Sequence, residues 1–180
     1  MTWLVLLVLT VGAGFVQTLL PGLAWLGQVK CPLLLGLVIY YAMQRETEVM
    51  LVAAVLAGVM QDALSPVPLG LSALLFILVG ASLARFRELV MSDAVVTQAF
   101  FGLVGAGVTA LLQCLLLLAT RTLVLSPGAV LLKVFGMALG GLVGTPVMFK
   151  VAGVLDRMAG NIRVAKEVEG TDSELDGITG

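Results

Sequence analysis

Residues able to do chemistry are few in this sequence, and they are scattered. Histidine is absent, and the two cysteines, Cys31 and Cys114, stand far apart in the chain. This excludes the usual zinc and haem ligand sets and the Cys–His nucleophile pair. No paired carboxylates, phosphate-binding glycine loop or nucleophile–base set is visible. We predict no catalytic residue, no metal site and no cofactor, and we expect both thiols to act as small apolar packing groups.

One acid, Asp62, falls inside an apolar segment, whereas we place the other acids in loops or in the C-terminal tail. A carboxylate at membrane depth is costly and usually faces a partner inside the protein. The partner is either a basic side chain, Lys133 or Arg121, or the backbone N–H groups freed where SPVPLG interrupts the helix. We expect Asp62 to clamp the third, fourth and sixth helices together. Binding of an ion or small cation is the alternative, although a lone carboxylate is a poor ion site.

Small residues recur at helical spacing in three apolar segments. The last segment has Gly136, Gly140, Gly141 and Gly144, the fifth has Gly102, Gly105 and Gly107, and the third has Ala54, Ala57 and Gly58. Small residues four apart share one helix face, where another helix can approach closely. We expect most of these faces to pack within one bundle, which leaves one of them for docking a partner's helix.

Isolated polar residues interrupt the apolar segments at Gln17, Gln98, Thr109 and Gln113. Hydrogen bonds between helices are the expected role of such residues, and lining a polar pocket is the alternative. In the last segment Pro146 follows Thr145, and we predict a kink there. None of these residues forms a reactive group with a neighbour in the sequence.

The composition shows which elements must position these residues. Of 180 residues, 60% are hydrophobic and only 12% are charged, and the mean hydropathy is +1.13. A soluble domain has about a quarter of its residues charged, so this chain needs lipid as its solvent. The net charge is −1 and the basic residues are dispersed, which excludes a nucleic-acid partner.

About 20 apolar residues cross a bilayer as a helix, so apolar runs bounded by charge or proline predict the spans. We predict an all-α integral membrane protein with helices over 3–20, 32–44, 49–64, 69–84, 95–119 and 129–155. The second run is short. Residues 1–155 then form one multi-pass transmembrane domain, and residues 156–180 form an acidic tail that we expect to be cytoplasmic and disordered.

Basic residues predict the orientation. With six spans, one side carries Arg45, Arg85, Arg87, Arg157, Arg163 and Lys166, and the other carries Lys30, Arg121 and Lys133. An excess of Lys and Arg in short loops marks the cytoplasmic side. We therefore predict that both termini lie in the cytoplasm.

The segment GVMQDALSPVPLG has the pattern G-x-x-x-D-x-x-S-x-x-P-L-G. Its fixed positions are Gly58, Asp62, Ser65, Pro68, Leu69 and Gly70, and LSALLFILVGASLA follows. This pattern, the chain length and the hydropathy profile resemble the rod shape-determining protein MreD family over roughly residues 3–155. Leu33 departs from the family, which commonly has an acid after the proline that opens the second helix.

The resemblance implies a component of the wall-elongation machinery in the bacterial cytoplasmic (inner) membrane. It implies association with the transmembrane helix of the single-pass protein MreC. Through MreC it implies contact with a wall glycosyltransferase/transpeptidase pair and the actin-like MreB. It also implies a six-helix bundle similar to the substrate-binding subunits of vitamin (ECF-type) transporters. We expect a non-enzymatic scaffold; the alternative is the membrane substrate-binding subunit of a small-molecule transporter, with Gln17 and Gln113 lining its pocket.

Overall fold

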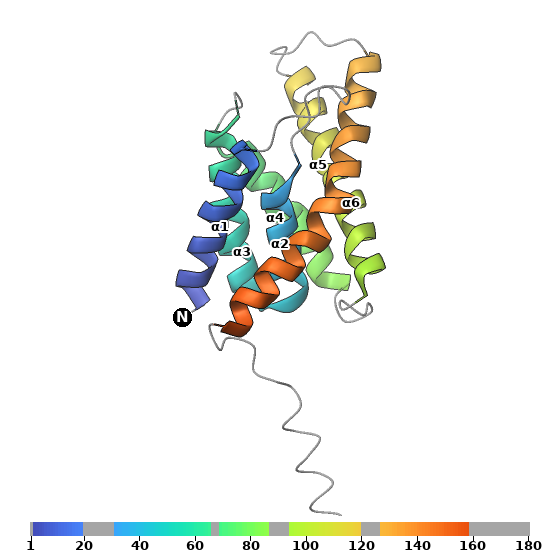
Figure 1. Ribbon diagram of the computed structural model, residues 1–180. Coiled ribbons are helices and arrows are strands. Elements are labelled where there is room, and N and C mark those ends of the chain that lie inside the picture. Colours follow the sequence, from blue (N-terminus) through green and yellow to red (C-terminus); the bar gives the residue numbers. More distant parts are fainter. Residues whose placement is uncertain (1, 20–30, 66–68, 87–93, 120–126, 159–180) are drawn as a thin grey trace, which may run out of the picture.

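The structure, a computed structural model, describes residues 2–19, 31–65, 69–86, 94–119 and 127–158, and all the regular secondary structure in these ranges is α-helix. The helices are α1 (Thr2–Leu19), α2 (Leu33–Gln44), α3 (Thr47–Ala63), α4 (Leu71–Phe86), α5 (Val95–Ala119) and α6 (Pro127–Met158). These six helices confirm the predicted number and order within the described ranges (Figure 1).

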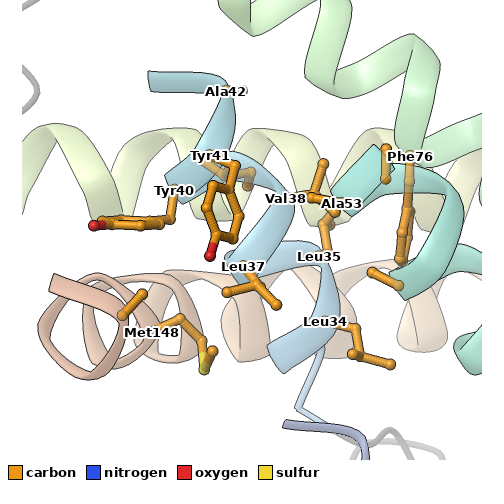
Figure 2. Packing of buried hydrophobic residues seen from close by; sticks show 14 of the residues in the cluster. Leu34, Leu35, Leu37, Val38, Tyr40, Tyr41, Ala42, Ala53, Phe76 and Met148 are labelled. Carbon is orange, nitrogen blue, oxygen red and sulfur yellow. The ribbon is translucent and has the colours of Figure 1, made fainter. Parts of the chain in front are cut away.

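Helix α2 is the centre of the bundle. It contacts each of the other five helices, and its residues from Leu33 to Met43 are all buried. Figure 2 shows its side chains pointing to several sides at once, toward Ala53 of α3 on one side and Met148 of α6 on another. A helix that is apolar around its whole circumference is stable only when it is enclosed. With 12 residues it is about 18 Å long, so it is shorter than the ~30 Å hydrocarbon core of a bilayer.

Two helices are long. By length and composition, Val95–Leu116 and Gly128–Met158 are sufficient to cross a membrane, whereas Trp3–Leu19, Leu33–Gln44 and Leu71–Arg85 are shorter apolar helices. Helix α6 continues through Pro146, and its lower half runs at an angle to its upper half (Figure 1). A proline that removes one backbone hydrogen bond within a helix accounts for such a bend.

Hydrogen bonds align the helix ends at two levels, which we call the upper and lower ends as drawn in Figure 1. At the upper end Gln17 of α1 meets Gln61 of α3 and the first turn of α2. The thiol of Cys31, just before α2, donates to the Gly140 carbonyl of α6 at 3.3 Å. At the lower end, the C-terminal turn of α2 meets the C-terminal turn of α6.

Candidate functional site

Asp62 lies at the upper end, where α3 meets the start of α4. Its carboxylate accepts a hydrogen bond from the Gly70 N–H at 2.7 Å and bonds at 3.1 and 3.2 Å from the Ser72 N–H. Its side chain is 2% exposed. The first N–H groups of a helix lack partners within the helix and carry the positive end of its dipole. Asp62 therefore caps α4 from a different helix.

Of the two basic side chains considered as partners of Asp62, only Lys133 is among the described residues. Lys133 is on α6, and α3 and α6 do not contact each other in the described ranges. Arg121 lies outside the described residues. The structure thus joins α3 to α4 through Asp62 but does not bring α6 into this contact.

The structure explains the two glycines of the sequence motif around Asp62. A Cβ atom on Gly58 would overlap the backbone of Ala73, so this glycine allows α3 and α4 to touch. Gly70 has a φ of +98°, a conformation that favours glycine, and it presents its N–H to Asp62. Ser65 Oγ accepts a weak bond from Gln61 at 3.5 Å, Leu69 is exposed, and Pro68 lies outside the described residues.

A second polar contact at the upper end involves two glutamines. The amide of Gln17 donates to Gln61 Oε1 at 2.9 Å and accepts a long bond from the Leu34 N–H at 3.5 Å. Gln17 is buried, and its bonds join α1, α2 and α3. This is the interhelical role expected of it. The buried hydroxyl of Thr109, by contrast, has no hydrogen-bond partner among the described residues.

A buried ionic cluster lies at the lower end, and the sequence analysis missed it. Asp156 is 0% exposed; it pairs with the Arg45 guanidinium at 3.2 Å and accepts a hydrogen bond from the Tyr40 hydroxyl at 2.9 Å. Placing Asp156 in the polar tail was wrong, because α6 extends to Met158. The missed signal is the buried stripe of Thr145, Met148, Phe149, Ala152 and Asp156, which continues at helical spacing past residue 155.

The glycines of α5 and α6 serve packing within the chain. Cβ atoms on Gly102 and Gly141 would each overlap the other residue's backbone, so these positions form the point where α5 and α6 cross. On the far side of α6, a Cβ on Gly140 would lie 2.9 Å from Pro32 Cδ, and one on Gly144 would lie 2.7 Å from Cys31 Sγ. These small faces are already occupied by other residues of this chain, so they are not available to a partner.

Two further glycines of the predicted set also face inward. Gly136 is buried, and a Cβ on Gly105 would lie 3.2 Å from Ile39 Cδ1 and 3.5 Å from Val79 Cγ1. Gly105 is at the same time part of the wall of a groove between α4 and α5.

This apolar groove has a volume of about 320 Å³. Its walls are Leu78, Val79, Ser82 and Leu83 of α4, and Phe101, Val104, Gly105 and Val108 of α5. The one hydroxyl among them, that of Ser82, donates to the Leu78 carbonyl of its own helix at 2.8 Å. The groove therefore offers van der Waals contact and no reactive group.

Three features of the structure are those of a helical membrane protein: α2 is buried, two helices are long and apolar, and leucines and valines are exposed along the outer faces. The sequence matches the family described as rod shape-determining protein MreD over residues 1–139. The chain belongs to this family, which has a role in determining cell shape. No curated protein and no solved structure matches it. The Gly58–Gly70 motif lies inside the matched range, whereas Asp156 lies beyond it.

Proposed function

We propose that this protein is a non-enzymatic scaffold of the bacterial wall-elongation complex. It sits in the inner membrane as a multi-pass protein and binds the transmembrane helix of MreC. Through MreC it contacts a wall glycosyltransferase/transpeptidase pair and MreB, and so maintains a rod shape. Family membership supports the role in cell shape, and the partners are our inference from the family.

The groove between α4 and α5 is the observation that carries the docking role. Its walls are apolar apart from the Ser82 hydroxyl, which is bonded within its own helix, so an apolar helix lying in the groove would find van der Waals contacts on both sides. The wall residues of α5 recur at positions 101, 104, 105 and 108, the spacing of one helix face. In lipid the hydrophobic effect does not drive helices together, because the acyl chains are as apolar as the side chains. Helices therefore associate through close packing of this kind.

Filling the groove tests this proposal. Val104 is 39% exposed in its wall, and Val104→Trp would occupy the space that a docked helix needs. We expect about tenfold weaker binding of MreC in copurification from detergent-solubilised membranes, equivalent to ~1.4 kcal/mol. Val147→Trp on α6, 48% exposed, is the matched control and should leave recovery unchanged. Equal recovery of MreC with both variants would remove the groove from the proposal.

The expected likeness to vitamin-transporter subunits leads to the second function, binding of a small substrate. In the structure the Gln17 amide is engaged by Gln61 and Leu34, and Gln113 is half-buried on α5. The engaged amide gives little support to a pocket lined by these two residues. Ligand-dependent thermal shifts of the purified protein, together with recovery of an ATPase module, would favour transport over scaffolding.

A further inference from the structure

Three helices with large exposed apolar faces are shorter than an ordinary bilayer is thick. Helices α1, α3 and α4 have 18, 17 and 16 residues, which correspond to about 24–27 Å of helix, whereas the hydrocarbon core is about 30 Å thick. Helix α1 contacts α3, and α3 contacts α4, so the three helices form one continuous wall beside α2. We call it the short wall. Leucines or valines are exposed along each of its helices.

Charged side chains reduce the apolar height of two helices of the short wall further. Glu48 lies in the first turn of α3 and Arg85 in the last turn of α4, both exposed and both at the lower end of the bundle. From Glu48 to Ala63, where α3 ends, the helix rises about 23 Å, and from Leu71, where α4 begins, to Arg85 it rises about 21 Å. The apolar height of the short wall is therefore about 7 to 9 Å less than the hydrocarbon thickness at α3 and α4.

Helix α5 has a greater apolar height. Its sequence contains no charged residue, and its exposed apolar side chains run from Val96 to Leu118, a rise of about 33 Å. At a mean tilt of ~20° such a helix spans about 31 Å, which matches the hydrocarbon core. Tilt lowers the vertical reach of a helix, so tilting cannot supply the height that the short wall lacks.

The two heights meet at the α4–α5 groove. Helix α4 belongs to the short wall, α5 has the greater apolar height, and these two helices provide the residues that line the groove. Figure 1 shows α1 and α3 on one side of the molecule and α5 and α6 on the other. Lipid around this chain therefore meets a step in apolar height between the two sides.

We propose that the protein thins the bilayer along the short wall, while the lipid next to α5 keeps its ordinary thickness. The short wall is covered by acyl chains, and it favours lipids with short chains. A full-length chain beside it either compresses or brings hydrocarbon against Glu48 and Arg85, and each costs free energy that grows with every ångström of mismatch. This inference goes beyond the proposed function and does not depend on MreC.

Quenching of tryptophan fluorescence by brominated lipids measures which lipids contact each face. In a chain with Trp3→Phe and Trp25→Phe, the reporter is Leu56→Trp on α3 or its matched counterpart Leu111→Trp on α5, where the native leucines are 40% and 48% exposed. The purified chain is reconstituted in mixtures of dimyristoleoyl- and dioleoyl-phosphatidylcholine, with one of the two lipids brominated. We expect about a threefold preference for the shorter lipid at position 56 and no such preference at position 111.

Extending the apolar surface of the short wall supplies the second measurement. In the Leu56→Trp chain, the combined substitutions Glu46→Leu, Glu48→Leu and Arg85→Leu, all at exposed positions, carry apolar surface toward the lower end. They should lower the preference for the shorter lipid to less than about twofold. The same three positions changed to Gln lose their charges but stay polar, so this matched control should keep the preference. Circular dichroism checks that all variants keep their helix content.

Three results would overturn the proposal. Equal lipid preferences at positions 56 and 111 would show that both faces meet a bilayer of one thickness. Absence of quenching at position 56 by either brominated lipid would show that protein, such as a second copy of this chain, covers the short wall. A preference that the three leucine substitutions leave unchanged would show that the charged residues do not set the lower edge of the short wall.

Discussion

At the residue scale, the two buried carboxylates have different binding partners. Asp62 neutralises the start of a helix through backbone N–H groups, whereas Asp156 is held by a guanidinium and a phenol. Neither geometry collects several carboxylates around one point, and no cluster of metal-ligating side chains occurs in the described ranges. Both carboxylates therefore connect helices, α3 to α4 and α2 to α6, at opposite ends of the bundle.

Removing the Asp62 carboxylate should destabilise α4 at its start. Because Asp62→Ala leaves the Gly70 and Ser72 N–H groups without acceptors, we expect a cost of about 2 kcal/mol. Asp62→Asn keeps one acceptor oxygen and should cost about half as much. Thermal unfolding in detergent micelles measures both. Glu48→Gln, an exposed acid on α3, is the control, and equal stability of Asp62→Ala and this control would refute the capping role.

The lower ionic cluster predicts non-additive mutations. Arg45→Met leaves the carboxylate of Asp156 buried without its cation and should cost about 3 kcal/mol. Asp156→Asn in the same chain should recover part of that loss, because the uncompensated charge is gone. A double-mutant cycle of unfolding free energies measures the coupling, with Arg157→Met, at an exposed neighbouring position, as the control. Strict additivity would show that the pair does not stabilise the fold.

At the scale of elements, the packing of the helices depends on the positions of glycine. Gly58 allows α3 to touch α4, and Gly102 with Gly141 allows α5 to touch α6. Close backbone approach of this kind supplies the dispersion contacts that hold helices together in lipid. The α4–α5 pair is different, because a groove remains between these two helices.

Adding a single methyl group at Gly141 tests the close crossing of α5 and α6. Gly141→Ala places a Cβ against the Gly102 carbonyl and the Ala106 methyl, so we expect a loss of about 2 kcal/mol from overpacking. Gly12→Ala on α1 meets nothing within 4 Å and should leave stability unchanged or raise it by up to about 0.5 kcal/mol. Unfolding in detergent compares the two, and a harmless Gly141→Ala would contradict the close crossing of α5 and α6.

At the scale of the whole molecule, α1 begins at the end of the bundle where α6 finishes (Figure 1). The bonds of Gln17 with the start of α2, and of Tyr40 with the end of α6, require this arrangement. The start of α1 and the end of α6 thus lie at the same end of the bundle, which is compatible with the predicted cytoplasmic location of the two termini.

Reporter fusions check this orientation. A fluorescent protein that matures only in the cytoplasm, fused after residue 180, should fluoresce, because the excess of Lys and Arg places this end inside. The same fluorescent protein fused after residue 125, between α5 and α6, should not fluoresce. A phosphatase that is active only in the periplasm should be active when it is fused at this position. Fluorescence after residue 125 and phosphatase activity after residue 180 would reverse the topology.

The sequence by itself determined the membrane class, the six helices and the family, because apolar run length, proline and glycine punctuation and the Gly58–Gly70 motif are local properties of the chain. It also indicated that Asp62 needs a partner. Only the tertiary structure decided which one, since the choice between Lys133 and the N–H groups of α4 depends on which helices touch. It likewise revealed the enclosure of α2, the Arg45–Asp156 pair and the α4–α5 groove. Each of these joins residues far apart in sequence, and no spacing along one helix encodes such contacts.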